Sequence, residues 1–105
     1  MRENAYQSYL KKRLLEQFPG SIVLKNDPNY LQGIPDLIVL YKKKWACLEV
    51  KVAENASHQP NQDYYVGLMN KMSFAAFIYP DNEEDVFDEL QRTLQPSRKA
   101  RLPRS

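Results

Sequence analysis

Two short apolar runs joined by three lysines constrain the fold of this chain more than any other feature. The first run covers residues 36–41 and the second covers residues 45–52, with the lysines at 42–44 between them. Runs of this length that are rich in β-branched and aromatic residues are typical of strands, and a short polar segment between two of them is typical of a turn. The sequence therefore predicts a β-hairpin, around which the rest of the domain has to pack.

The apolar periodicity of the remaining chain predicts five further elements around this hairpin. They are a helix over residues 3–18, a strand over 21–25, a helix over 57–71, a strand over 74–79 and a helix from 81 toward Pro96. Ser57 is the expected cap of the second helix, and Asp81 with Glu84 is the expected capping box of the third. This order predicts an α/β fold in which helices cover a central sheet.

The length and composition favour a single domain. A chain of 105 residues with 43% hydrophobic and 27% charged residues is long enough to bury one modest core. We expect residues 1–95 to form this domain and residues 96–105 to form a flexible basic tail. No apolar run has the length of a membrane span or of a signal peptide, and the lone Cys47 suits a reducing compartment, so we expect a cytoplasmic protein.

Positive charge is spread unevenly over the chain. The formal net charge is +2, but residues 92–105 carry five Lys/Arg and no acid, and six of the thirteen acidic residues fall within 81–89. Basic side chains at the hairpin turn and in the tail are candidates for sequence-independent contact with the DNA backbone, while a solvated turn and tail are the alternative. The candidates are Lys42, Lys43, Lys44, Arg98, Lys99 and Arg101.

Charged side chains inside the apolar runs require a physical explanation. Alternation along a strand places Glu49 and Lys51 on one face, and burial of an unpaired charge is costly. A salt bridge on an exposed edge strand is one explanation. Asp36 favours another, because it begins the neighbouring strand and the hairpin can bring its carboxylate beside that of Glu49. Two carboxylates and a lysine suit a Mg²⁺ site for phosphodiester hydrolysis.

The segments Gly33-Ile34-Pro35-Asp36 and Glu49-Val50-Lys51 resemble the bipartite signature of the PD-(D/E)XK nuclease superfamily. With Gln62-Asp63-Tyr64-Tyr65 they look most like the VRR-NUC branch, and the resemblance covers about residues 3–79. It implies a restriction-endonuclease-like αβββαβ core with a mixed central sheet, followed here by a C-terminal helix. It also implies that Asp36 and Glu49 bind Mg²⁺, or Mn²⁺ in its place, and that Lys51 is the catalytic lysine.

Many members of this superfamily also place a glutamate of the first helix at the metal site. Glu3 and Glu16 are the candidates. With about 100° of rotation around the helix axis per residue, Glu3 lies roughly 20° from the core-facing Leu10, and Glu16 lies about 120° from it. We therefore expect Glu3 to be the metal ligand, with an exposed first-turn glutamate as the alternative. Gln62 is expected to bond Lys51 or a metal-bound water, unless it is an ordinary surface glutamine, and His58 to contact phosphate or backbone.

These residues predict a magnesium-dependent DNA endonuclease. Small nucleases that resemble this chain are often encoded by bacteriophages, and they include homodimers that cut four-way (Holliday) junctions in DNA recombination. The resemblance therefore implies branched DNA as the substrate, a homodimer and, for a phage protein, action in the host cytoplasm. A general nickase or flap nuclease is one alternative. A catalytically idle nucleic-acid-binding module is another, although Asp36, Glu49 and Lys51 are all present.

Overall fold

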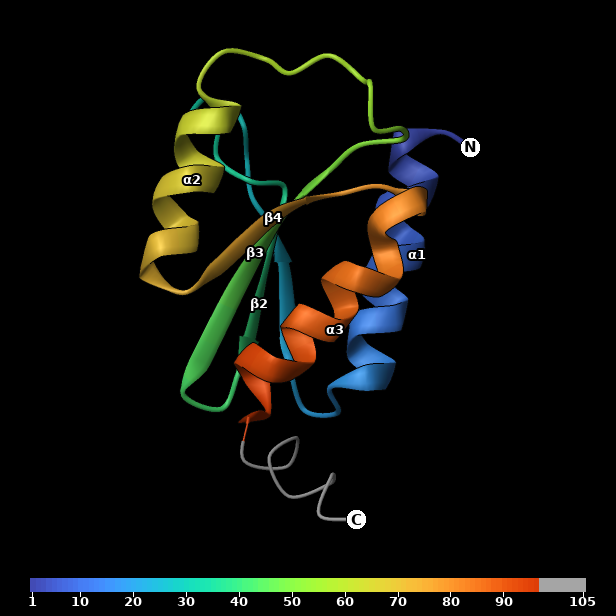
Figure 1. Ribbon diagram of the computed structural model, residues 1–105, viewed down its shortest axis with the longest axis vertical. Helices are drawn as coiled ribbons and strands as arrows, with labels where there is room; N and C mark the ends of the chain where they lie inside the picture. Colours follow the sequence, from blue (N-terminus) through green and yellow to red (C-terminus); the bar gives the residue numbers. More distant parts are fainter. Residues whose placement is uncertain (97–105) are drawn as a thin grey trace.

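The computed structural model describes residues 1–96 and contains a four-stranded sheet covered by helices (Figure 1). In chain order the elements are α1 (Glu3–Gln17), β1 (Ile22–Lys25), β2 (Leu37–Tyr41), β3 (Lys44–Val50), α2 (Gln62–Met72), β4 (Phe74–Ile78), the short 3₁₀ helix η1 (Pro80–Asn82) and α3 (Glu83–Leu94). The predicted α/β class and the order of the elements are confirmed. Among these residues, the helices are too short or too polar to cross a membrane.

The predicted hairpin forms the middle of the sheet, whose strand order is β1-β2-β3-β4. β2 pairs antiparallel with β1 and β3, whereas β3 and β4 run parallel, so the sheet is mixed. Beyond the end of β3, the Lys51 N–H still donates to the Ile78 carbonyl at 2.9 Å. Because β3 lies between two partner strands, the exposed-edge explanation for Glu49 and Lys51 is wrong.

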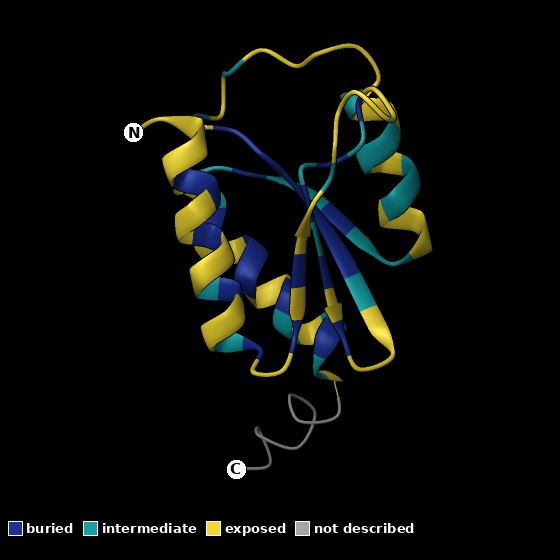
Figure 2. Ribbon diagram, turned by 180° about the vertical axis from the view of Figure 1, so that it is seen from behind, coloured by how far each residue is buried: buried dark blue, intermediate teal, exposed yellow. Residues whose placement is uncertain are grey.

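Alternation along the strands gives the sheet two different faces. The face toward α1 and α3 holds the main core, which includes Leu10, Leu14, Val39, Leu48 and Leu90. Figure 2 shows buried residues on the sides of α1 and α3 that face the sheet. The opposite face lies under α2, which packs on β3 and β4 and has no buried residue of its own. The thinner cover on this second face leaves room for a site.

The second helix begins later than predicted, at Gln62, so the expected Ser57 cap is wrong. Residues 51–61 form a loop in which the Ser57 carbonyl accepts a hydrogen bond from Lys51 Nζ at 3.0 Å. Asn61 then adopts a left-handed backbone with a φ of 73° immediately before the helix. A right-handed helix cannot run through that conformation, so α2 starts only after Asn61.

The third helix begins only after Asn82, so the expected capping box of Asp81 and Glu84 is wrong. Asp81 lies in η1, and the side chain of Asn82 fixes this bend. Its Oδ1 accepts the Tyr79 N–H at 2.9 Å, and its Nδ2 donates to the Phe77 carbonyl at 2.9 Å. These two bonds join the end of β4 directly to the start of α3.

A largely buried ionic cluster joins α1 to α3. Glu83, in the first turn of α3, is only 7% exposed and accepts hydrogen bonds from the Tyr6 hydroxyl at 2.8 Å and the Tyr9 hydroxyl at 2.7 Å. The Arg13 guanidinium also donates to Glu83 and lies over the Phe87 ring, 3.9 Å from its centroid. Burial and the bond to Glu83 raise the pKa of Tyr6. The three donors from α1 therefore hold one carboxylate of α3.

Glu83→Ala should lower the free energy of unfolding by about 3 kcal/mol, because it leaves the buried Tyr6 hydroxyl without its acceptor and removes one acceptor of Arg13. Glu84→Ala is the matched control, since Glu84 also pairs with Arg13, at 2.8 Å, but its side chain is 80% exposed. A much smaller loss is expected for this control. Urea denaturation followed by circular dichroism measures both variants, and equal losses would contradict the importance of the Glu83 cluster.

Candidate active site

Asp36 and Glu49 meet at the end of the hairpin that is remote from its turn. Leu37 pairs with Leu48 in the β2–β3 register, so Asp36, just before β2, comes opposite Glu49. Asp36 Oδ2 accepts the Val50 N–H at 2.9 Å, which fixes its carboxylate beside β3. The antiparallel pairing thus brings together two carboxylates that lie thirteen residues apart in the sequence.

Glu49 is a carboxylate with an incomplete set of partners. Its side chain is 2% exposed; Oε2 accepts a hydrogen bond from Gln62 Nε2 at 2.9 Å and lies 3.8 Å from Lys51 Nζ. The other oxygen, Oε1, is buried and has no hydrogen-bond partner among residues 1–96. Burial, followed by the negative charge of Asp36, raises the pKa of Glu49 to about 8, against the opposing effect of Lys51. The site therefore leaves this carboxylate short of positive charge.

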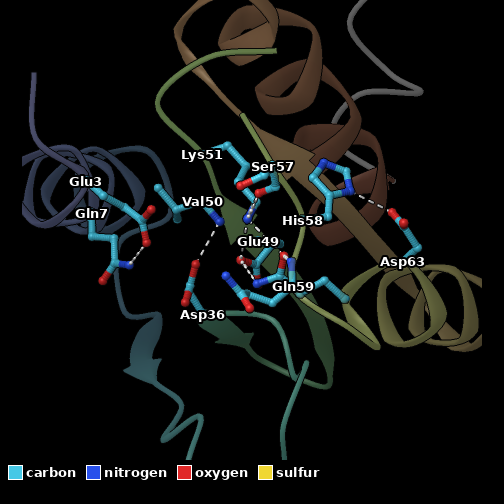
Figure 3. A network of polar contacts seen from close by, with 11 residues as sticks. Glu3, Gln7, Asp36, Glu49, Val50, Lys51, Ser57, His58, Gln59 and Asp63 are labelled. Carbon is cyan, nitrogen blue, oxygen red and sulfur yellow. Dashed lines mark hydrogen bonds and ion pairs between the residues drawn. The ribbon is translucent and has the colours of Figure 1, made fainter. Parts of the chain in front are cut away.

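Lys51 and Gln62 hold each other in place beside Glu49, and Figure 3 shows Lys51 together with Ser57 and Glu49. Lys51 is 7% exposed, and its Nζ donates to Gln62 Oε1 at 2.8 Å and to the Ser57 carbonyl at 3.0 Å. Gln62 Oε1 also accepts the Gln59 N–H at 2.8 Å, while its Nε2 bonds Glu49. The expected contact between Gln62 and Lys51 is present, so Gln62 is no ordinary surface glutamine.

Glu3 approaches the same site from the first turn of α1. The negative charge of Glu3 is a small further cause of the raised pKa of Glu49. Glu3 Oε2 accepts a 3.5 Å hydrogen bond from Nε2 of Gln7, a polar residue that is 6% exposed. Glu16, by contrast, lines a separate hollow with Arg13 on another side of α1. Glu3 itself is exposed in the first turn of α1, so it does not lie on the buried stripe that its angle to Leu10 predicted.

The donor set suits a hard divalent cation held by few protein ligands. Within residues 1–96, no three His, Cys, Asp or Glu side chains are arranged as a ready metal-binding cluster. Mg²⁺ usually keeps several waters and needs only one or two carboxylates, which Asp36 and Glu49 supply. The buried, unpaired Oε1 of Glu49 is an acceptor that lacks a donor, and a cation would meet that need. The residues present therefore fit Mg²⁺ or Mn²⁺, with Glu3 as a further candidate ligand.

Gly33 and Pro35 of the Gly-Ile-Pro-Asp segment have structural tasks that the sequence did not reveal. Gly33 has a φ of +91°, and a Cβ placed on it would lie 2.6 Å from Asn61 Cβ and 2.9 Å from the Asn61 carbonyl oxygen. The glycine therefore allows the loop before β2 to touch the residue that precedes Gln62. The Pro35 carbonyl accepts a bond from Asn26 Nδ2 at 2.8 Å, which steadies the chain before Asp36.

The residues predicted to contact nucleic acid lie at different ends of the sheet or outside the described residues. His58 Nδ1 lies 2.8 Å from Asp63 Oδ1, and its ring stands edge-on to Phe77, with 4.2 Å between ring centroids. Phe77 is paired with Glu49 in the β3–β4 register, so His58 belongs to the active end of the sheet. Lys42, Lys43 and Lys44 are exposed at the opposite end of the hairpin, and Arg98, Lys99 and Arg101 lie outside the described residues.

A scan against protein-family models and searches of curated proteins and of solved structures returned no match to this chain.

Gly33→Ala should destabilise the fold more than Gly20→Ala. The two glycines have φ values of 91° and 90°, so each alanine has a similar backbone cost of roughly 1 kcal/mol. At Gly20 nothing lies within 4 Å of an added Cβ, whereas at Gly33 the backbone of Asn61 would have to move. Urea denaturation of both variants compares the losses. Equal losses would contradict the tight contact between Gly33 and Asn61.

Divalent cations should stabilise the protein more strongly as the pH rises, because Glu49 must lose its proton to bind a cation. The pKa of Glu49 is raised to about 8 from 4.5 in the folded protein. Without metal, the protonated Glu49 therefore contributes fully to the free energy of unfolding below pH 4.5, and this contribution is lost as the pH rises through 8. Saturating Mn²⁺, at about 100 times its Kd, should therefore restore ~2.7 kcal/mol at about pH 8.5 and much less at about pH 5.

Thermal melting with Mn²⁺ or EDTA measures this effect, with Asp36→Asn as the control. This variant keeps the shape of the side chain but removes one of the two negative charges. A Mn²⁺-induced rise in Tm that is the same at both pH values, or the same in Asp36→Asn, would contradict cation binding by this pair.

Proposed function

We propose that this chain is a metal-dependent DNA endonuclease of the PD-(D/E)XK type, most like the VRR-NUC branch. The observation that carries the proposal is the buried Oε1 of Glu49, which has no hydrogen-bond partner in the described part of the chain although Asp36 and Lys51 lie beside the same carboxylate. The order α1-β1-β2-β3-α2-β4 supports it, because it matches the αβββαβ order of the restriction-endonuclease-like core that the motifs imply.

The side chains of the site have distinct tasks in phosphodiester hydrolysis. Bound by Asp36 and Glu49, with Glu3 as a further ligand, Mg²⁺ or Mn²⁺ would neutralise charge on the phosphate and lower the pKa of a bound water. Lys51 orients the attacking water or stabilises the negative charge that develops on the phosphate. Gln62 is a positioning residue, since it acts through its hydrogen bonds to Lys51 and Glu49.

Branched DNA, in particular a four-way junction, is the substrate we propose. The described residues form one small sheet with its helices, and such a surface suits contact with the DNA backbone better than reading of a long base sequence. Cutting both strands of a junction symmetrically needs two active sites, so a homodimer belongs to this proposal. His58, at the active end of the sheet, is a candidate to contact the phosphate backbone.

Purified protein should cut a labelled four-way junction in Mg²⁺ or Mn²⁺ faster than linear duplex or single-stranded DNA. Lys51→Ala and Asp36→Ala should each lower the single-turnover rate by about 10²- to 10⁴-fold, because each removes a group that acts at the reacting phosphate. Lys71→Ala is the matched control, since Lys71 is exposed in the last turn of α2. Denaturing gels of end-labelled strands give the rates and the cut positions.

The outcomes separate the parts of the proposal. Cutting that persists in EDTA or in Lys51→Ala would overturn the assigned site. Binding of DNA without cutting in either metal would favour the idle binding module instead. A monomer in light scattering at the working concentration would overturn symmetric junction cleavage and leave the nuclease assignment intact.

A further inference from the structure

A polar groove of about 260 Å³ lies between α1 and the β1–β2 side of the sheet. Its polar wall consists of Asn4, Gln7, Ser8 and Lys11 on α1 and Lys25 at the end of β1. The apolar part of its lining comes from Val23 and Leu37. The groove is smaller than most sites for drug-sized ligands, and it suits a compact polar group.

The groove carries positive charge without a compensating acid in its lining. Lys11 and Lys25 supply two ammonium groups, while Asn4, Gln7 and Ser8 supply neutral hydrogen-bonding groups. The ammonium group of lysine is a compact positive charge on a flexible side chain, and it binds phosphate well. This combination of charges and neutral donors suits an anionic phosphate group, and a phosphodiester of the DNA backbone carries such a group.

The groove begins where the candidate active site ends. Gln7 lines the groove and also donates to Glu3, the carboxylate of α1 whose negative charge is a small further cause of the raised pKa of Glu49. On the sheet side, Leu37 lines the groove, whereas the side chain of the preceding Asp36 lies on the opposite face. A DNA strand bound at the candidate active site would reach this groove by passing along the first turns of α1, which carry Glu3 and Gln7.

We propose that the groove binds a phosphodiester next to the scissile one and so fixes the path of the cut strand over α1. This inference rests on the proposed nuclease function and adds a binding site to it. Contacts with flanking phosphates position a protein on DNA without reading its bases. Lys11 and Lys25 are then positioning residues for the substrate strand, and they should govern substrate binding more than the chemical step.

Another lysine of the same helix provides a matched comparison. Lys12 is exposed like Lys11, but it lines a different hollow, together with Tyr9, Arg13 and Glu16. The double variant Lys12→Ala/Lys71→Ala removes two positive charges from the surface, as many as Lys11→Ala/Lys25→Ala removes. Any difference between these double variants therefore reports the groove and not the net charge.

The experiment measures kcat and KM for junction cleavage at several salt concentrations. For Lys11→Ala/Lys25→Ala we expect KM to rise roughly tenfold at about 0.1 M salt, and the slope of log(kcat/KM) against log[salt] to become shallower by about 0.9, as for one lost phosphate contact. The value of kcat should stay within about twofold, since the groove adds uniform binding. Lys12→Ala/Lys71→Ala should keep the wild-type slope.

A series of junctions, each with one neutral methylphosphonate, locates the contact. In wild type, neutralising one phosphate beside the cut position should raise KM, and Lys11→Ala/Lys25→Ala should be insensitive to that same change. If the double variant cuts like wild type, or keeps the full methylphosphonate effect, the groove assignment is overturned while the nuclease proposal stands. If wild type itself does not cut DNA, the nuclease proposal falls, and the groove assignment falls with it.

Discussion

Burial of the Glu49 carboxylate in the central strand is the constraint on which the rest of the site depends. A charge removed from water in this way is stable only where other groups compensate for it. Here the compensation is partial: Lys51 and Gln62 approach one oxygen, whereas the other has no hydrogen-bond partner within the described chain. The Asp36 carboxylate beside it increases the deficit of positive charge. This arrangement gives no advantage to a purely structural ion pair, and it is compatible with the cation that we propose.

The two faces of the sheet differ in what they hold: one holds the apolar core and the other holds the polar residues of the candidate site. On one face α1 and α3 enclose the apolar core, and the cluster around Glu83 fastens the two helices to each other. On the other face α2 is only partly buried, and its first residue, Gln62, reaches Lys51 and Glu49. The packing of α1 and α3 can therefore hold the strands in register, while the face under α2 presents polar side chains. The groove along α1 lies on the first face, beside β1 and the start of β2.

Local sequence signals identified the elements well but misplaced two helix starts. Ser57 is a good capping residue by type, yet its carbonyl is engaged by Lys51 and the chain turns left-handed at Asn61 before α2 begins. Asp81 and Glu84 have the spacing of a capping box, but the side chain of Asn82 bonds the end of β4 instead. In both cases a hydrogen bond to a residue three to six positions away took the place of the expected cap.

The sequence by itself determined the strands, the helices and the residue types at the site, because apolar periodicity and short motifs are local properties of a chain. It indicated that Asp36 and Glu49 would meet, since an antiparallel hairpin relates its two strands by a simple register. Only the tertiary structure decided that β3 is central and that Glu49 has an unpaired oxygen. It also decided that Lys11 and Lys25 line the same groove. The distance between these two lysines is set by the packing of α1 on the sheet, which sequence spacing does not reveal.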